Sequence, residues 1–179
     1  IIASFLFLSL ISVYISQEEI GVYGNLLAIL NISVAILGLG SEKLIVRDFV
    51  SQDSFNYSLI NSTVIAQFMV TVFIGIGSGL FITDISTIPL YIFVLAVLVT
   101  VIGRSLQRAV RLSGFPRTAL IIDVLSIRFL LLLLGVIGWA FQFELTSKNL
   151  FVSFSFFSSL ALIIYFLFYF IKNKENIYF

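Results

Sequence analysis

The sequence predicts an all-α membrane protein, a polytopic bundle of about six transmembrane helices. Two observations lead to this prediction. Of the 179 residues, 60% are hydrophobic and 11% are charged, whereas soluble domains have about 45–50% apolar and about 25% charged residues. The apolar residues also form continuous runs, most of them at least 20 residues long, which as helices would cross a hydrocarbon core of about 30 Å. The strands of a membrane barrel would be only about ten residues long and would alternate in polarity.

Six apolar segments are expected as helices of a single transmembrane domain that covers residues 1–179. They are residues 1–15, 22–41, 57–82, 89–112, 117–141 and 149–171. The first is short for a span, which needs about 20 residues, and it lacks the basic region and cleavage site of a signal peptide. We expect it to be the remaining part of a truncated helix. Thr87 is placed to cap the helix that Pro89 opens, and Pro116 lies at the start of the fifth segment.

Basic residues alternate between the connections and thereby predict the orientation. Eight of the ten Lys and Arg residues lie in 42–56, in 103–117 and in the C-terminal tail: Lys43, Arg47, Arg104, Arg108, Arg111, Arg117, Lys172 and Lys174. The connections at 16–21, 83–88 and 142–148 hold Lys148 alone. The positive-inside rule therefore predicts that the loops 42–56 and 103–117 and the tail are cytoplasmic. The arginines of 103–117 are explained by this retention together with anionic lipid headgroups.

Three of the expected helices have small and polar residues at spacings of three and four, so that each set forms a stripe along one face. The stripes are Gly24, Ala28, Asn31, Ala35, Gly38 and Glu42; Thr63, Gln67, Thr71, Gly75 and Gly79; and Ala96, Thr100, Gly103, Gln107 and Arg111. Such stripes let membrane helices approach closely and exchange hydrogen bonds. They are compatible with simple packing of the bundle and with a polar cavity inside it.

Several classes of chemistry are disfavoured by the residues present. The chain has no cysteine and no histidine, which excludes disulfides, thiol chemistry, the commonest transition-metal sites and a Ser-His-Asp triad. The stretches LGLGSEK (37–43) and GIGSG (75–79) lack the spacing of a phosphate-binding loop. The loops opposite the basic ones have only six or seven residues. We therefore expect no enzyme activity, no cofactor, no metal and no nucleic-acid partner.

Arg128 lies within the apolar fifth segment, where a charge at the centre of a bilayer helix costs about 2.5–3.5 kcal/mol. Asp123 is five residues away and so points about 140° from it on a helix; the two are not an i, i+4 pair. Arg128 is then either paired with another helix for structural reasons or exposed to an aqueous cavity that holds an anionic ligand. The second interpretation is favoured because charges inside the membrane mark substrate paths. Asp123 is the candidate for coupling to an ion.

Residues 15–49, ISQEEIGVYGNLLAILNISVAILGLGSEKLIVRDF, resemble the opening of Wzx-type polysaccharide flippases, which belong to the multidrug/oligosaccharidyl-lipid/polysaccharide exporter superfamily. The matching residues are Glu18, Glu19, Gly21, Tyr23, Gly38, Leu39 and Arg47. Residues 106–136 resemble the end of the fourth helix and the start of the fifth in that family. The sequence departs from the family pattern at Ser16-Gln17, where Gly-Pro is common, and at Ile20, where an aromatic residue is common.

The resemblance implies one lobe of a two-lobe transporter in the bacterial inner membrane. Its substrate would be an oligosaccharide linked to undecaprenyl diphosphate, moved to the outer leaflet by alternating access for lipopolysaccharide O-antigen or capsule synthesis. Membrane lipids and other polysaccharide assembly proteins are further expected partners. Arg128 would attract the anionic head group at mid-depth, and Lys43 with Arg47 would receive it at the cytoplasmic mouth. Neutral polar residues would contact sugar hydroxyls: Asn31, Gln67 and Thr71.

Two alternatives to a flippase remain open on the sequence. The first is a drug or cation antiporter of the related multidrug branch, in which Asp123 would bind the proton or sodium ion. The second is a structural membrane subunit without transport activity, in which Arg128 would be only a paired charge.

Overall fold

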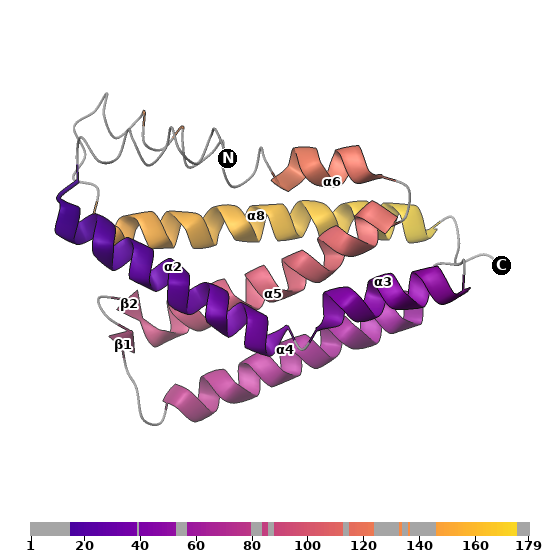
Figure 1. Cartoon of the computed structure of the whole chain (residues 1–179), viewed down its shortest axis with the longest axis horizontal. Helices are drawn as coiled ribbons and strands as arrows, with labels where there is room; N and C mark the ends of the chain where they lie inside the picture. Colours follow the sequence, from indigo (N-terminus) through magenta and orange to yellow (C-terminus); the bar gives the residue numbers. More distant parts are fainter. Residues whose placement is uncertain are drawn as a thin grey trace.

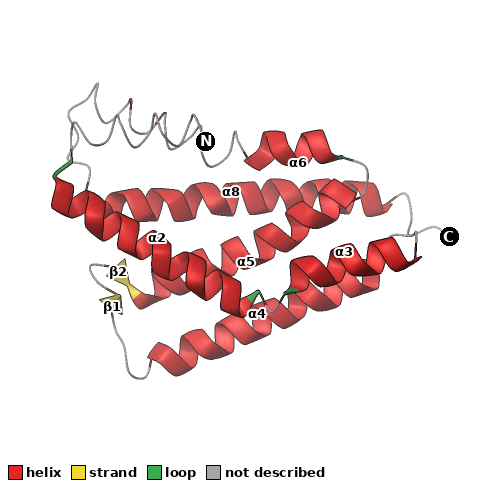
Figure 2. Ribbon diagram, in the orientation of Figure 1, coloured by secondary structure: helices red, strands yellow, loops and turns green. Residues whose placement is uncertain are grey.

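A computed structural model describes residues 15–38, 40–52, 57–79, 84–85, 88–112, 115–123, 133, 136 and 146–174. Their helices are α2 (Gln17–Leu37), α3 (Ser41–Gln52), α4 (Tyr57–Gly79), α5 (Leu90–Leu112), α6 (Pro116–Asp123) and α8 (Ser147–Lys174) (Figure 1). Two short antiparallel strands, β1 (Asp84–Ile85) and β2 (Ile88–Pro89), lie between α4 and α5 (Figure 2).

The prediction of an all-α polytopic bundle is confirmed. Four of the described helices are long and apolar enough to cross a membrane, namely α2, α4, α5 and α8. Apart from Ile15, the expected first helix (1–15) lies outside the described residues. Of the expected fifth helix (117–141), the structure describes the part within α6 and two isolated residues, 133 and 136.

The N-terminal boundary of α2 differs from the expected one, because the helix begins at Gln17 and not at residue 22. Ser16 is its N-cap, and the Ser16 side-chain oxygen accepts a hydrogen bond from the Glu19 backbone N–H at 3.3 Å. Glu18 and Glu19 stand in the first turn, where negative charge is favourable beside the positive end of the helix dipole. The stretch SQEEI is therefore a capped first turn and not a loop.

The C-terminal boundary of α2 is a second correction. The helix was expected to continue to residue 41 and to be followed by a cytoplasmic loop at 42–56, but it ends at Leu37 and a separate helix, α3, begins at Ser41. Gly40, between them, has a φ of 67°, a conformation that glycine adopts at no steric cost. In α3, Ser41 and Ile45 are buried while Lys43 and Arg47 are exposed, so one face of this short helix packs against the bundle.

Helix α5 lies at the centre of the described bundle and contacts α2, α3, α4, α6 and α8 (Figure 1). One apolar cluster joins α2, α5 and α8; within it the rings of Phe93 and Phe151 stack with centroids 5.9 Å apart. A second cluster joins α3, α4, α5, α6 and α8 around Leu106 and Ala109, which are almost fully buried. The outward face of α4 exposes large apolar side chains such as Phe73, at 80%, which suits contact with lipid tails.

The connections separate into two ends, as the charge alternation predicts. The starts of α2 and α8 and the β1–β2 pair lie at one end, whereas α3, α6 and the final turns of α5 and α8 lie at the other (Figure 1). At the first end, the Ser147 backbone N–H donates to Oε2 of Glu19 at 2.7 Å. This hydrogen bond fixes the start of α8 to the first turn of α2.

Candidate functional site: a cation-lined cavity

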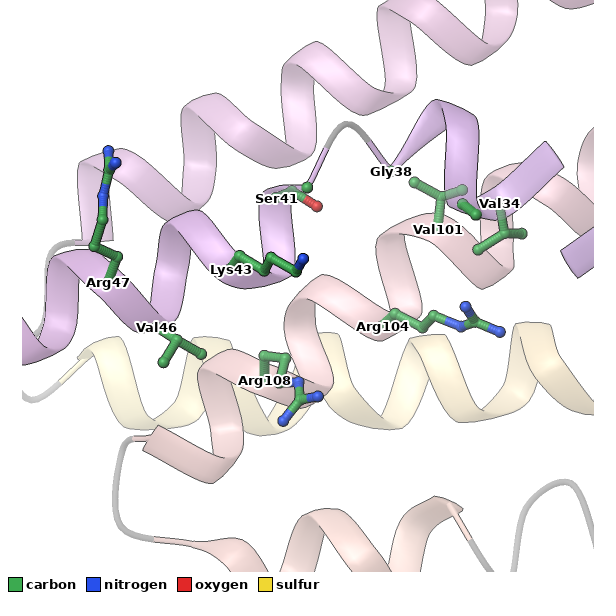
Figure 3. A pocket seen from close by; sticks show the side chains of 11 residues that line it. Val34, Gly38, Ser41, Lys43, Val46, Arg47, Val101, Arg104 and Arg108 are labelled. Atoms are coloured by element: carbon green, nitrogen blue, oxygen red, sulfur yellow. The ribbon is translucent and has the colours of Figure 1, made fainter. Parts of the chain in front are cut away.

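A cavity of about 620 Å³ lies where the end of α2, the start of α3 and the second half of α5 meet (Figure 3). Its volume is within the range of about 300–1,000 Å³ that small-molecule sites span. The residues that line it are Val34, Ala35, Gly38, Gly40, Ser41, Lys43, Val46, Arg47, Val101, Arg104 and Arg108.

The lining of this cavity is strongly cationic. Lys43 and Arg47 come from α3, and Arg104 and Arg108 come from α5, each pair at i, i+4. Among these described lining residues there is no aspartate or glutamate. Like charges at i, i+4 destabilise a helix by about 0.2–0.5 kcal/mol per pair, so two such pairs beside one cavity favour the binding of an anion there. In Figure 3 the Lys43 side chain extends toward Ser41 and α5, whereas Arg47 points away from the other three cations.

The Arg104 side chain is held by α2. Its Nη2 donates to Oδ1 of Asn31 at 2.9 Å, and Nδ2 of Asn31 donates to the Leu27 carbonyl oxygen, also at 2.9 Å. Asn31 was expected to contact a sugar, and the structure shows that its carbonyl oxygen is occupied in orienting a guanidinium group. Arg104 itself is half-buried, so its charge lies inside the bundle and not in an exterior loop.

The cavity lies deep relative to the ends of the helices around it. Ser41, at the start of α3, is buried and contacts Gln67 and Ser105. Ser105 lies seven residues before the end of α5 and Gln67 lies ten residues after the start of α4, which at 1.5 Å per residue is about 10 Å and about 15 Å along the helices. The start of α3 is therefore about two to three helical turns away from these ends.

Gln67 and Thr71, which were expected to contact a substrate, are not among the residues that line this cavity. Gln67 is 2% exposed and its Nε2 donates to Oγ of Ser41 at 2.5 Å and to Oγ of Ser105 at 2.9 Å. Ser105 in turn donates to Oε1 of Gln67 at 3.1 Å. Gln67 is therefore a polar tie between α3, α4 and α5. Thr71, also 2% exposed, has a buried hydroxyl with no hydrogen-bond partner in the part of the chain that the structure describes.

The small and polar stripes of α4 and α2 support different interpretations of the sequence, the first a simple packing of the bundle and the second a polar cavity. On α4 the stripe packs: a Cβ atom at Gly75 would lie 2.7 Å from Cγ1 of Val94 on α5. On α2 the stripe is not the packed face, because Tyr23, Leu26, Leu30 and Val34 are buried instead. Its inner end lines cavities, since Ala35 and Gly38 face the cation-lined cavity and Asn31 faces a second one.

The structure adds two residues that the sequence analysis did not assign to the site. Arg104 and Arg108 were explained as retention signals, yet they line the cavity with Lys43 and Arg47. The sequence contained a signal for this placement: Arg104 and Arg108 are four residues apart, and each directly follows a residue of the small and polar stripe on α5, Gly103 and Gln107. Arg128 lies outside the described residues. Asp123 ends α6, and its side chain is outside the described part, so the roles of both remain predictions.

Comparisons of the chain with family models, with curated proteins and with solved structures found no match. The fold is that of a polytopic helical membrane protein, and four cationic side chains line one of its cavities. The residues that the structure describes include no group of three or more His, Cys, Asp or Glu placed to bind a metal ion.

Proposed function

We propose that this protein is a flippase that moves a lipid-diphosphate-linked oligosaccharide across the bacterial cytoplasmic membrane for polysaccharide synthesis, by alternating access. The observation that supports it best is the cavity lined by Lys43, Arg47, Arg104 and Arg108. A diphosphate head group has the negative charge that these four cations would bind, and guanidinium groups can bind phosphate oxygens in a bidentate way.

The position of the cavity supports the same proposal. A lipid-linked substrate keeps its tail in the hydrocarbon while its head crosses, so the anion site has to lie within the membrane-spanning bundle. The hydrogen bonds of Ser41 to Gln67 and Ser105 support this requirement, because they hold the start of α3 against α4 and α5, two helices long and apolar enough to span a membrane. The charge distribution assigns the α3 end of the bundle to the cytoplasm, where the lipid-linked precursor would enter.

The alternative of a drug or cation antiporter gains less support. Four cationic side chains line the cavity, and they would repel a cationic substrate. A cavity of about 620 Å³ lined by four cationic side chains favours a ligand-binding role over a purely structural one.

The test is transport by the purified transporter that contains this chain together with its second lobe, in vesicles that hold a fluorescent polyprenyl-diphosphate oligosaccharide. The rate is measured as the loss of access to a membrane-impermeant quencher. Lys43 is exposed, so Lys43→Ala and Lys43→Glu are expected to fold normally. We expect Lys43→Ala to slow transport about tenfold, which corresponds to about 1.4 kcal/mol, and Lys43→Glu to slow it further.

The matched control is Lys148→Ala, which removes an exposed lysine at the opposite end of the bundle and should leave the rate unchanged. Absence of transport by the unsubstituted protein would refute the flippase proposal. Equal transport rates for Lys43→Glu and Lys148→Ala would show that the cation-lined cavity does not take part in transport.

A further inference from the structure

A second cavity, of about 300 Å³, lies between α2, α5 and α8. Its lining differs from that of the cation-lined cavity, because its polar side chains are mostly uncharged: Asn31, Thr100, Gln107 and Ser158. Phe154 and Tyr165 add aromatic surface to it. We call this space the neutral cavity.

One of these polar groups lacks a partner in the part of the chain that the structure describes. Ser158 is 5% exposed, and its hydroxyl is buried with no hydrogen-bond partner among the described residues. A hydroxyl buried in this way loses its hydrogen bonds to water and gains none in return, which is unfavourable for folding. Gln107 is half-buried and lines the same cavity from α5. An amide and a hydroxyl together supply donors and acceptors for a ligand that has hydroxyl groups.

Arg104 connects the two cavities. It is the one residue with a formal charge among the described residues that line the neutral cavity, and it also lines the cation-lined cavity. Asn31, which accepts its hydrogen bond at 2.9 Å, stands in the wall of the neutral cavity. A ligand with an anionic part joined directly to an uncharged polar part would therefore fit this arrangement. Its anionic part would lie in the cation-lined cavity and its polar part in the neutral cavity, with Arg104 between them.

We infer that the neutral cavity is a subsite for the sugar that is joined directly to the diphosphate, while the diphosphate occupies the cation-lined cavity. This inference rests on the proposed function, since it assigns the second part of the same substrate. The volume of about 300 Å³ is at the lower end of the range for small-molecule sites, so the subsite accepts one sugar and not the whole oligosaccharide. A site built to hydrogen-bond hydroxyl groups strongly rejects ligands that lack them.

The experiment measures binding of two probes to the protein in lipid nanodiscs. One probe is farnesyl diphosphate, and the other is farnesyl diphosphate linked to N-acetylglucosamine. We expect the sugar-bearing probe to bind at least tenfold more tightly. Gln107→Leu and Ser158→Ala should each remove most of this difference while leaving the affinity for farnesyl diphosphate within twofold. Lys43→Ala should weaken both probes by a similar factor.

Thermal unfolding of the same samples separates a binding role from a structural one. Because the Ser158 hydroxyl has no described partner, Ser158→Ala should unfold at the same or a higher temperature while losing affinity for the sugar-bearing probe. Thr100→Val serves as a second, nearly isosteric variant in the same wall. It should also weaken that probe alone.

The outcomes distinguish the two proposals. If both probes bind with equal affinity and none of the three wall variants changes it, the subsite is refuted while the anion site stands. If neither probe binds the unsubstituted protein, the proposed function fails and the subsite fails with it.

Discussion

At Gly75 the absence of a side chain allows α4 and α5 to approach each other. A Cβ atom there would lie 2.7 Å from Cγ1 and 3.2 Å from Cγ2 of Val94, closer than van der Waals contact permits. We predict that Gly75→Leu destabilises the protein by about 1–3 kcal/mol through overpacking, measured as a lower unfolding temperature and a lower yield of monodisperse protein. Phe73→Leu is the control, because Phe73 is 80% exposed on the opposite side of α4. Equal effects of the two substitutions would show that the helices do not meet at Gly75.

Gln67 and Thr71 are one helical turn apart and equally buried, yet we predict opposite effects of replacing them. Gln67→Leu leaves the hydroxyls of Ser41 and Ser105 without their amide partner, and interhelical hydrogen bonds of this kind contribute about 0.6–2 kcal/mol in membranes. Thr71→Val removes a hydroxyl that has no described partner and should be neutral or stabilising. Unfolding temperatures in detergent would measure both effects. A larger loss for Thr71→Val would contradict the assignment of the polar tie.

The sequence predicted which polar residues share a helix face but could not assign their contacts. Gln67 and Thr71 were grouped correctly in one stripe, yet whether a stripe faces a neighbouring helix or a cavity depends on the rotation of the helix within the bundle. The Asn31–Arg104 hydrogen bond joins residues 73 positions apart, and no local pattern predicts a contact at that separation. From the sequence, Arg104 was therefore explained only as a charge that retains the loop in the cytoplasm, whereas in the structure it lines the cavity.

At the scale of elements, the break between α2 and α3 is the feature that positions Lys43. Gly40 has a φ of 67°, and no heavy atom lies within 4 Å of the place where a Cβ would stand. The cost of another residue there is thus backbone strain alone, about 1–2 kcal/mol. We predict that Gly40→Val lowers both the unfolding temperature and the affinity for farnesyl diphosphate, because the start of α3 shifts. Gly40→Asn should be milder, since asparagine tolerates the left-handed region better. Identical behaviour of the two variants would mean that the conformation of Gly40 is not required.

Helix α3 was missed for a physical reason. Long apolar runs identify membrane spans, and α2, α4, α5 and α8 were found in this way. The sequence SEKLIVRDFVSQ is half polar and only 12 residues long, so hydropathy placed it in a loop. Its apolar spacing indicates a helix with one buried face, but that face is useful only because α4 and α5 lie beside it. The pattern becomes informative once the neighbouring helices are known.

At the scale of the whole molecule, the two ends of the bundle differ in charge. The end that holds α3 and α6 has eight of the ten basic residues of the sequence within its segments, whereas Lys148 stands at the other end. This segregation of basic residues was predictable from the sequence, because successive connections between membrane-spanning helices lie at opposite ends of the bundle. The positive-inside rule predicts the side of the membrane on which each end lies, and this prediction is open to a direct test.

We predict that a cysteine at position 148 is labelled by a membrane-impermeant maleimide in intact cells, and that a cysteine at position 117 is labelled only after the membrane is opened. Lys148 and Arg117 are both exposed, and the chain has no cysteine of its own, so any labelling reports the introduced residue. Ser147 is unsuitable, because it is 2% exposed and its backbone N–H is bonded to Glu19. Neither substitution should invert the protein: Arg117→Cys leaves seven basic residues on the cytoplasmic side, and Lys148→Cys removes the only one from the outer connections. Labelling of position 117 in intact cells would reverse the predicted topology. It would also contradict the proposed function, in which the cation-lined cavity receives its substrate from the cytoplasmic side.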